Sequence, residues 1–348
     1  GIEFEYVILD EAQYIKNQKT KNAQSVKTLK TRHKLALTGT PIENSLAELW
    51  SIFDFLMPQY LFNYHYFQKQ YENDIVKNND EEKTKQLKKL VTPFILRRNK
   101  KEVLTELPDK IEQNIILPFN DEEEKIYVAN LAKANKELQE LYDLEGSDKM
   151  QILKLLTRLR QLCLEPRLVY DNIDQPSSKL KACMELIKTM QENKQKVLLF
   201  SSFTSVLDLI AEECQKAGIT YYMLTGSTNK EDRRELVSRF QKDDTTVFLI
   251  SLKAGGTGLN LTSAETVIHF DPWWNVSAQN QATDRAYRIG QKNNVQVFNL
   301  VMKDSVEEKI IELQKRKKEL ADMFVENNSG GLSQMSKEDI LSLFTMYQ

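Results

Sequence analysis

The sequence predicts an α/β protein with two parallel-sheet domains. Short apolar runs alternate with segments of helical length near the start of the chain and again in its second half. Polar side chains follow directly after several of these runs, where parallel sheets bind their ligands. A length of 348 residues is more than one hydrophobic core covers. With 28% charged and 41% hydrophobic residues, the composition is that of a folded globular chain.

The first block reads as strand, helix, strand. The apolar, β-branched run at residues 4–9 predicts a buried parallel strand, and Asp10 and Glu11 follow it. Residues 34–38 predict a second strand, with a helical segment over residues 16–31 between them. A parallel sheet that starts with such a strand lacks cover, so we expect an open sheet edge to which another chain can associate.

A helical region with aromatic side chains follows. Apolar residues spaced three and four apart predict one core-facing stripe, formed by Leu46, Leu49, Trp50, Phe53 and Leu56. Residues 92–96 resemble a further buried strand, and the stretch up to residue 110 reads as a connector. Eight basic residues and no acidic ones occur from residue 83 to 101, which fits either a solvated helix face or a phosphate contact.

The second half repeats the α/β rhythm. Residues 111–119 predict a strand, and residues 121–164 predict a helical attachment. Four more strands are predicted at residues 197–200, 221–224, 246–250 and 266–270, with helices starting near residues 178, 205 and 230. A charged helix is expected over residues 303–320, before a break in regular structure and a short terminal helix.

Cysteine, histidine and hydropathy patterns exclude several classes. Cys163, Cys183 and Cys214 are widely spaced, which argues against a zinc site and a disulfide framework and predicts buried thiols. The three histidines have no metal-ligand spacing, so we expect no zinc, and neither haem nor flavin. No apolar run reaches a membrane span and no signal peptide is visible, which predicts a cytoplasmic protein without membrane contact.

The acidic pair after the first strand suits phosphoryl transfer. One carboxylate there can hold Mg²⁺ while its neighbour orients the water that attacks a γ-phosphate. Taken alone, an Asp-Glu pair after a strand is more often the acidic start of an ordinary helix. The small hydroxyl-rich turn Thr38-Gly39-Thr40 could sense the phosphate state from the adjacent strand.

A glycine-rich stretch follows the predicted strand at 246–250. Its backbone N–H groups, over residues 251–260, could bind phosphate. It is not a P-loop, and the pattern Gly-x-x-x-x-Gly-Lys-Ser/Thr occurs nowhere in the sequence. The sequence therefore contains no loop of this type to cradle the β- and γ-phosphates of a nucleotide.

Two arginines form the most telling constellation. On a helix Gln281, Arg285 and Arg288 would share one face, where two guanidinium forks can converge on one anionic ligand. Such forks suit a transition state whose charge spreads over phosphate oxygens. The alternative is a surface salt-bridge face with Asp284.

Taken in order, these blocks resemble the SWI/SNF-like ATPases of helicase superfamily two, two-lobed RecA-like motors that translocate on double-stranded DNA. Asp10-Glu11-Ala12-Gln13 resembles the second motif, and residues 35–50 resemble the third. Residues 197–203 resemble the fourth motif, residues 255–260 with 271–275 the fifth, and residues 281–291 the sixth. Glu165-Pro166 stands where the family often has His-Pro, and Val276 where proline is common.

The resemblance implies a domain plan. It comprises a remnant of RecA-like lobe one (1–62), helical protrusion one (63–92), the end of lobe one and the inter-lobe linker (93–110), the first strand of lobe two (111–120), helical protrusion two (121–172), a complete RecA-like lobe two (173–302), and a C-terminal helical brace with its tail (303–348).

The resemblance also implies roles. Asp10 would bind Mg²⁺, Glu11 would polarise the attacking water, and Arg285 and Arg288 would act as arginine fingers. ATP would further contact Gln13, Gly255, Gly258, Gln281 and Asp284. Double-stranded DNA phosphates would lie near Ser201, Ser202, Thr225, Gly226, Lys253 and Thr257, with Trp274 beside the track. Such contacts carry no base information and weaken with salt.

Two rival functions stay open. A strand-separating helicase is disfavoured because unwinding relatives commonly carry a glycine before the first finger, where this chain has Asp284. The second rival is a non-catalytic module that binds nucleic acid or a protein partner. The protein target that a motor would displace or remodel on DNA cannot be read from the sequence. This chain would be associated with the nucleoid if its source is a bacterium and would be nuclear if its source is a eukaryote.

Overall fold

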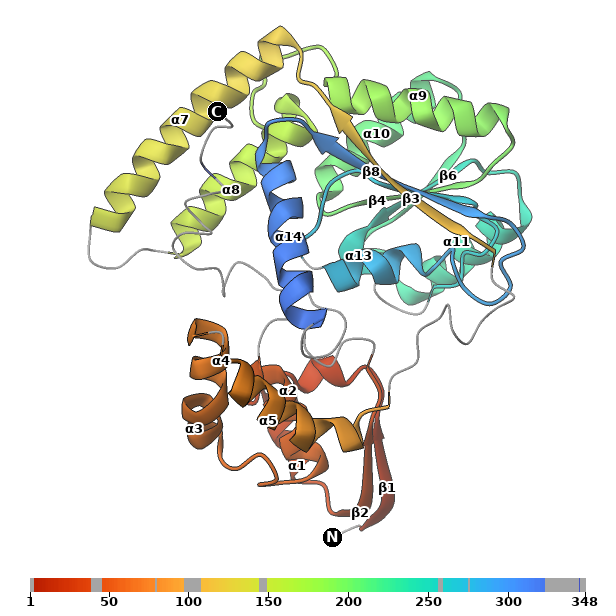
Figure 1. The fold of residues 1–348 in the computed structure, drawn as a ribbon. Coiled ribbons are helices and arrows are strands. Elements are labelled where there is room, and N and C mark those ends of the chain that lie inside the picture. The colour runs from red at the N-terminus through yellow and green to blue at the C-terminus, as the bar shows by residue number, and fades with distance from the viewer. Residues whose placement is uncertain are drawn as a thin grey trace. The chain divides into compact units, whose positions relative to one another are not determined.

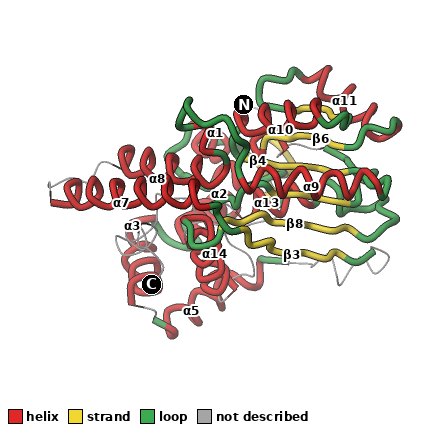
Figure 2. Tube along the Cα trace, turned by 90° about the horizontal axis from the view of Figure 1, so that it is seen from above, coloured by secondary structure: helices red, strands yellow, loops and turns green. Residues whose placement is uncertain are grey.

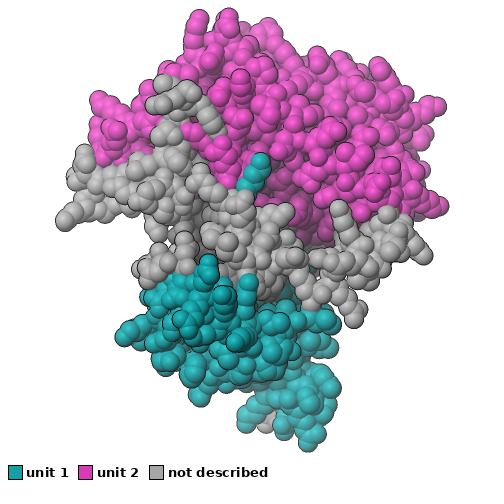
Figure 3. Space-filling model, in the orientation of Figure 1, with its two compact units in different colours: residues 1–103, 314–334 teal, residues 104–313, 335–348 magenta. Residues whose placement is uncertain are grey.

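The computed structural model of the chain describes residues 3–38, 46–78, 80–96, 108–143, 149–255, 259–274, 276–322 and 344. Within these ranges the side chains of residues 76–78, 141–143, 149, 253, 255, 277 and 316–322 are not described. The chain divides into two compact units, coloured separately in Figure 3. Unit 1 comprises residues 1–103 and 314–334, and unit 2 comprises residues 104–313 and 335–348.

A two-stranded parallel sheet begins unit 1. Strand β1 (Phe4–Leu9) pairs with β2 (Thr31–Ala36), and the short helices η1 (Ala12–Ile15) and α1 (Lys21–Lys27) connect them. The predicted strand–helix–strand order is confirmed, with α1 shorter than the predicted helix at residues 16–31 and β2 starting before the predicted strand at residues 34–38. Thr20 caps α1, its side chain accepting a hydrogen bond from the backbone of Ala23.

The predicted burial of β1 is wrong for the described chain. One face of the sheet packs against Ile15, Ala23 and Phe55. The opposite face is exposed, with Phe4, Tyr6, Ile8, Leu35 and Leu37 between 42% and 62% accessible. A parallel strand is buried on both sides only when elements cover both faces of its sheet. The described elements cover one.

The helices of unit 1 form a separate apolar cluster. They are α2 (Leu46–Leu56), α3 (Tyr64–Phe67), the π-helical η2 (Gln68–Glu72), α4 (Asn73–Asn78), α5 (Glu81–Val91) and the 3-10 turn η3 (Thr92–Phe94). The predicted core stripe is confirmed on α2, where Leu49 and Phe53 are fully buried and Leu56 is half-buried. The predicted strand at residues 92–96 is wrong: Pro93 opens η3, and Phe94 and Leu96 are exposed.

Unit 2 is built on a six-stranded, wholly parallel sheet in the order β3-β8-β7-β4-β6-β5. The strands are β3 (Lys110–Leu117), β4 (Val197–Ser201), β5 (Tyr221–Leu224), β6 (Val247–Ser251), β7 (Thr266–His269) and β8 (Val295–Met302), and they lie side by side in Figure 2. Strand β8 was not predicted. It lies between β3 and β7 and pairs with both.

Helices cover both faces of this sheet (Figure 1). On one face α9 (Ser178–Glu192) and α10 (Thr204–Lys216) pack against Val197, Leu199 and neighbouring side chains. On the other face α11 (Lys230–Lys242), α12 (Leu252–Gly255) and α13 (Val276–Thr283) enclose Leu198 and Phe200. Because successive residues of a strand point to opposite faces, a strand covered twice reads as one apolar run.

A helical hairpin and the first part of a C-terminal helix, up to Leu313, complete unit 2. Helices α7 (Asp121–Asp143) and α8 (Lys149–Leu164) pack together and are followed by the 3-10 turn η4 (Pro166–Leu168). Helix α14 (Val306–Asp322) starts where the backbone N–H of Val306 donates to the hydroxyl of Tyr127 on α7, at 2.8 Å. Among the described residues no helix is both long and apolar enough to cross a membrane.

The three cysteines are buried and free, as predicted. Burial raises the pKa of the Cys163 and Cys183 thiols well above the usual range, and raises that of Cys214 to about 12. The neutral thiol is a poor nucleophile, so these side chains act as small apolar residues of the core.

Candidate functional site

The acid pair lies at the carboxyl end of β1, on the exposed surface of unit 1. Two backbone hydrogen bonds join the ends of the strands there: Leu37 donates to Leu9 at 2.7 Å, and Ala12 donates to Leu37 at 2.9 Å. Glu11 adopts φ 51° and ψ 51°, the left-handed region that residues with a Cβ rarely occupy. Such a conformation costs roughly 1 kcal/mol or more and is typical of functional positions.

A chain of side-chain hydrogen bonds connects the acid pair to the end of β2. Gln13 Nε2 donates to Glu11 Oε2 at 2.5 Å, and Thr38 Oγ1 donates to Gln13 Oε1 at 2.7 Å. The backbone N–H of Glu11 donates to Asp10 Oδ1 at 2.9 Å. Gln13 thus fixes the Glu11 carboxylate relative to the turn that starts at Thr38. Residues 39–45, which include the rest of the predicted turn, lie outside the described residues.

Asp10 fits one part of a magnesium site. Its carboxylate is exposed, and carboxylate oxygens are the ligands that Mg²⁺ prefers in proteins. Among the side chains that the structure describes, no group of three or more His, Cys, Asp or Glu could hold a metal ion. In nucleotide sites Mg²⁺ is usually bound through one or two carboxylates together with phosphate and water oxygens.

A second polar cluster lies at the carboxyl edge of the unit 2 sheet, around Asp271. This carboxylate is 1% exposed and follows β7. Its Oδ1 accepts hydrogen bonds from Ser201 Oγ at 2.7 Å and from the backbone of Ser202 at 3.0 Å. Its Oδ2 accepts from Ser202 Oγ and from Arg160 Nη2, the latter at 2.9 Å. Ser201 is fully buried, so its hydroxyl serves Asp271, while Ser202 is half-buried.

Sequence reasoning gave no role to Arg160 or Asp271. Asp271 lies in the stretch that resembles the fifth motif and Arg160 in helical protrusion two, and the two residues are 111 positions apart. Their pairing depends on how α8 packs on the sheet. A buried charge needs a partner, so a charged residue within an apolar helix is the one sequence signal that could have pointed to it.

Several other predicted DNA and nucleotide contacts lie in segments that follow strands of the unit 2 sheet. Thr225 and Gly226 lie in the turn after β5, and a Cβ on Gly226 would meet no atom within 4 Å. Trp274 is half-buried after β7. Lys253 and Gly255 belong to α12, although their side-chain positions are not described, and Thr257 and Gly258 lie outside the described residues.

The two arginines do not share a helix face, contrary to the prediction. Helix α13 ends at Thr283, and Asp284 to Ala286 form a turn. Arg285 is half-buried and Arg288 exposed. Two hydrogen bonds to the segment 259–261 hold this turn. The backbone N–H of Leu261 donates to the carbonyl of Arg285 at 3.0 Å, and Arg288 Nη1 donates to the carbonyl of Leu259 at 3.5 Å. Of the two predicted nucleotide contacts, Gln281 is on α13 and Asp284 is in the turn.

A buried histidine supports the end of α13. His269 Nε2 and Thr283 Oγ1 are 2.9 Å apart, and His269 Nδ1 has no hydrogen-bond partner in the described structure. Burial lowers the pKa of His269 from 6.5 to about 4, against the opposing effect of Glu112 and Asp271. The ring is therefore neutral at neutral pH.

Acid is expected to destabilise unit 2 through His269. Because folding lowers the pKa of His269, the contribution of its neutral ring to the free energy of unfolding is fully present above pH 6.5. That contribution is lost as the pH falls toward about 4. Over that interval the unfolded chain binds a proton that the folded chain does not, which removes up to about 3 kcal/mol. The variant His269→Gln retains a nitrogen for Thr283 and does not titrate. Urea unfolding at pH 7.5 and 4.5 should therefore show a smaller loss for the variant, and an equal loss would disprove this account.

Glu165, a departure from the family pattern, is a buried structural acid. It is 1% exposed and accepts hydrogen bonds from Arg167 Nε at 3.0 Å and from the backbone of Ser177 at 2.9 Å. The Glu165 carboxylate raises the pKa of Arg167. The pair joins the end of α8 to the start of α9.

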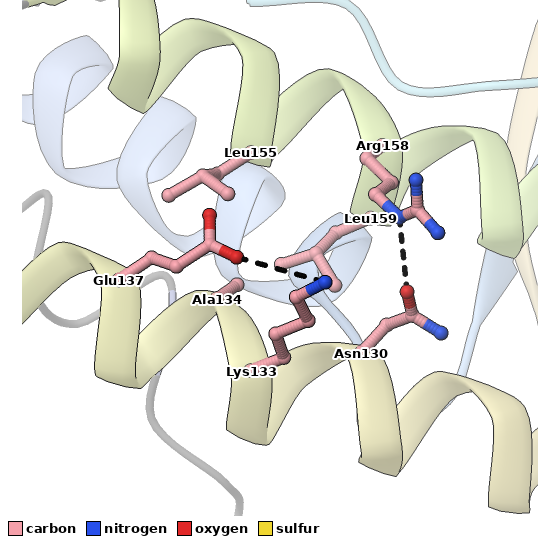
Figure 4. A pocket seen from close by; sticks show the side chains of 7 residues that line it. All are labelled: Asn130, Lys133, Ala134, Glu137, Leu155, Arg158 and Leu159. Carbon is pink, nitrogen blue, oxygen red and sulfur yellow. Dashed lines mark hydrogen bonds and ion pairs between the residues drawn. The ribbon is translucent and has the colours of Figure 1, made fainter.

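The cavity in Figure 4 lies away from all these groups, between α7 and α8. Its volume is about 130 Å³, below the roughly 300 Å³ of small-molecule sites. Asn130, Lys133, Glu137 and Arg158 supply its polar lining, with Arg158 Nε donating to Asn130 Oδ1 at 3.0 Å. None of the predicted site residues lines this cavity.

Two protein-family models match the sequence. The one described as SNF2-related domain matches residues 1–168, and the helicase conserved C-terminal domain matches residues 178–290. The SWI2/SNF2 ATPase core of Sulfolobus solfataricus, solved in complex with double-stranded DNA, is 34% identical with a TM-score of 0.58. The match covers 100% of this chain and 74% of that one. The chain belongs to the SNF2 family of ATP-dependent helicases and remodellers.

Two bacterial relatives support this membership. An uncharacterized ATP-dependent helicase of Mycoplasma pneumoniae is 39% identical over 342 residues, with 98% of this chain and 32% of that protein covered. A putative ATP-dependent helicase/translocase of Bacillus subtilis is 38% identical over 349 residues, covering 98% and 37%. The SNF2-family chain thus spans about a third of the length of these relatives.

Membership confirms the predicted fold class. The six-stranded sheet of unit 2 is the complete RecA-like lobe two, and the β1–β2 sheet belongs to lobe one. The change between units at residues 103 and 104 falls inside the predicted connector at 93–110. The finer domain boundaries and the roles of the individual site residues stay predictions.

Proposed function

We propose that this chain is part of a DNA-dependent ATPase that translocates along double-stranded DNA and displaces or remodels proteins bound to it. The observation that carries the proposal is the hydrogen-bonded series Glu11–Gln13–Thr38, which ties the hydrolysis pair to the end of the neighbouring strand. A change at the turn after Thr38 would move the Glu11 carboxylate. Coupling of this kind is what a motor needs between nucleotide state and movement.

In the proposed reaction Asp10 holds the Mg²⁺ that accompanies ATP, which supplies charge neutralisation at the phosphates. Glu11 accepts the hydrogen bond of the attacking water and orients it. Gln13 keeps Glu11 in place. Arg285 and Arg288 stabilise the charge that develops on the γ-phosphate oxygens.

Double-stranded DNA is proposed as the track because the Sulfolobus SWI2/SNF2 core was solved bound to it. Ser202 and Thr225 place hydroxyl groups at the carboxyl edge of lobe two, and hydroxyl groups are among the donors that bind phosphates in protein–DNA complexes. Binding should be independent of sequence. For about six phosphate contacts the affinity would fall by roughly three orders of magnitude between about 50 and 200 mM salt.

Glu11→Gln tests the catalytic half of the proposal. In a longer form of the protein that includes a phosphate-binding loop, this variant should lower DNA-stimulated ATP turnover by a factor on the order of 10² to 10⁴, since a general base contributes this much. ATP binding should persist. The 348-residue chain alone should hydrolyse ATP negligibly, because its sequence contains no Gly-x-x-x-x-Gly-Lys-Ser/Thr.

Three outcomes would contradict the proposal. Turnover by the 348-residue chain that Glu11→Gln abolishes would show that the loop is dispensable. Unchanged turnover of Glu11→Gln in the longer protein would favour the non-catalytic binding module. Displacement of one DNA strand by the longer protein would favour a strand-separating helicase.

The exposed apolar face of the β1–β2 sheet supports a proposal about association. It carries Phe4, Tyr6 and Ile8, each more than 40% accessible. We propose that the chain associates with a second copy of itself at this sheet. If light scattering shows that the 348-residue chain stays strictly monomeric at high concentration, association with a second copy is excluded.

A further inference from the structure

Arg160 is the one charged side chain of α8 that reaches the carboxyl edge of the lobe two sheet among the residues the structure describes. It is 7% exposed. Its Nη2 donates to Asp271 Oδ2 at 2.9 Å, to Ser202 Oγ at 2.9 Å and to the carbonyl of Pro272 at 3.3 Å. One guanidinium from the helical hairpin therefore contacts the segment after β4 and the segment after β7.

The same guanidinium lies among three aromatic rings. Its central carbon is 5.0 Å from the ring centre of Phe203 and 5.9 Å from those of Trp273 and Trp274. A planar cation can stack on such rings while its edge donates hydrogen bonds, which an ammonium group cannot do to the same extent. Arg160 Nε has no hydrogen-bond partner in the described structure.

The consequence is geometric. Asp271 accepts one hydrogen bond from the backbone N–H of Ser202 and another from its hydroxyl. Arg160 donates to the same hydroxyl. Trp274 follows Asp271 by three residues, and the guanidinium carbon of Arg160 lies over its ring. Two of the side chains that are proposed to meet DNA are thus fixed by one residue of α8.

We propose that Arg160 is a positioning residue for DNA engagement, which holds Ser202 and Trp274 in their binding arrangement and couples them to the α7–α8 hairpin. The proposal rests on the proposed function, because it assumes that the two residues face DNA. A purely structural ion pair with Asp271 would instead contribute to stability alone. The two accounts predict different results for Arg160→Lys, because lysine keeps the positive charge and lacks the planar fork.

The experiment uses the 348-residue chain with Trp50→Phe, which leaves only Trp273 and Trp274 as tryptophans. Arg160→Lys and Arg160→Met are compared with Arg158→Met. Arg158 is exposed on the same helix and bonds to Asn130 and Tyr170 instead. The readouts are the Kd for a labelled DNA duplex from fluorescence anisotropy, acrylamide quenching of tryptophan emission, and the midpoint of thermal unfolding.

Arg160→Met should raise the Kd roughly tenfold or more, and Arg160→Lys by a smaller factor. Quenching should rise in the same order, and Arg158→Met should leave both unchanged. Arg160→Lys with wild-type Kd and quenching would overturn the proposal, and it decides the matter even where Arg160→Met does not fold. If the unsubstituted chain binds no duplex, the proposed function fails, whereas the quenching series still shows whether Arg160 holds the tryptophans.

Discussion

Substituting either finger arginine, as Arg285→Lys or Arg288→Lys, is expected to lower DNA-stimulated ATP turnover of the longer protein by about 10³-fold or more. This is the contribution of an arginine finger to phosphoryl transfer. Lysine keeps the positive charge, but it lacks the planar fork that can bond two phosphate oxygens at once. The structure holds the backbone of Arg285 through Leu261, whereas Arg288 bonds to the carbonyl of Leu259 through its own guanidinium.

The measurement is steady-state turnover at saturating ATP and DNA, with ATP binding followed separately. Arg239→Lys is the matched control, because Arg239 is an exposed residue of lobe two whose charge pairs with Glu235 at 3.6 Å. It should leave turnover unchanged. If Arg285→Lys and Arg288→Lys both keep more than about a tenth of the turnover, neither arginine acts as a finger.

The largest stability effect is expected for Lys179→Met. Lys179 on α9 and Glu307 on α14 are 0% and 1% exposed, and Lys179 Nζ lies 2.7 Å from both carboxylate oxygens of Glu307. The Glu307 carboxylate also accepts a hydrogen bond from the backbone of Met302 at 2.9 Å. Burial raises the pKa of Glu307 even with the lysine beside it. Removing the cation should therefore cost about 3 to 5 kcal/mol.

Thermal unfolding of the 348-residue chain would report this loss as a fall in the midpoint of lobe two on the order of 10 °C. The double variant Lys179→Met/Glu307→Gln should recover most of it, since glutamine keeps an acceptor for Met302 and carries no charge. Lys181→Met, on the exposed side of the same helix, is the control. A Lys179→Met loss no larger than that of the control would mean that the pair contributes nothing net.

Much of the fold could be predicted because its strands are apolar runs. Strand β5 was predicted with its observed bounds, and β4, β6 and β7 within one residue at either end. Strand β8 was missed although it is buried between β3 and β7. Its sequence includes Gln296 and Asn299, and these amides find partners only in the folded sheet, where Asn299 bonds to Glu112 and Asn114.

Two errors have different causes. Residues 92–96 are apolar enough for a strand, but residues 92–94, which include Pro93, form a 3-10 turn, and among the described residues no strand pairs with them. The arginine segment has helical spacing, but after Thr283 the carbonyl of Arg285 bonds to Leu261 and the side chain of Arg288 bonds to Leu259. In this second case contacts with another part of the chain decided the local conformation.

The sequence by itself determined the family, the α/β fold and the residues of the motor motifs, because strand composition and short motifs are local properties. Only the tertiary structure decided that Gln13 connects Glu11 to Thr38, that Asp271 and Arg160 are buried together, and that Lys179 neutralises Glu307. These pairs depend on which elements pack against each other. A buried charge is stable only beside its partner, so the packing that buries it also selects the residue that neutralises it.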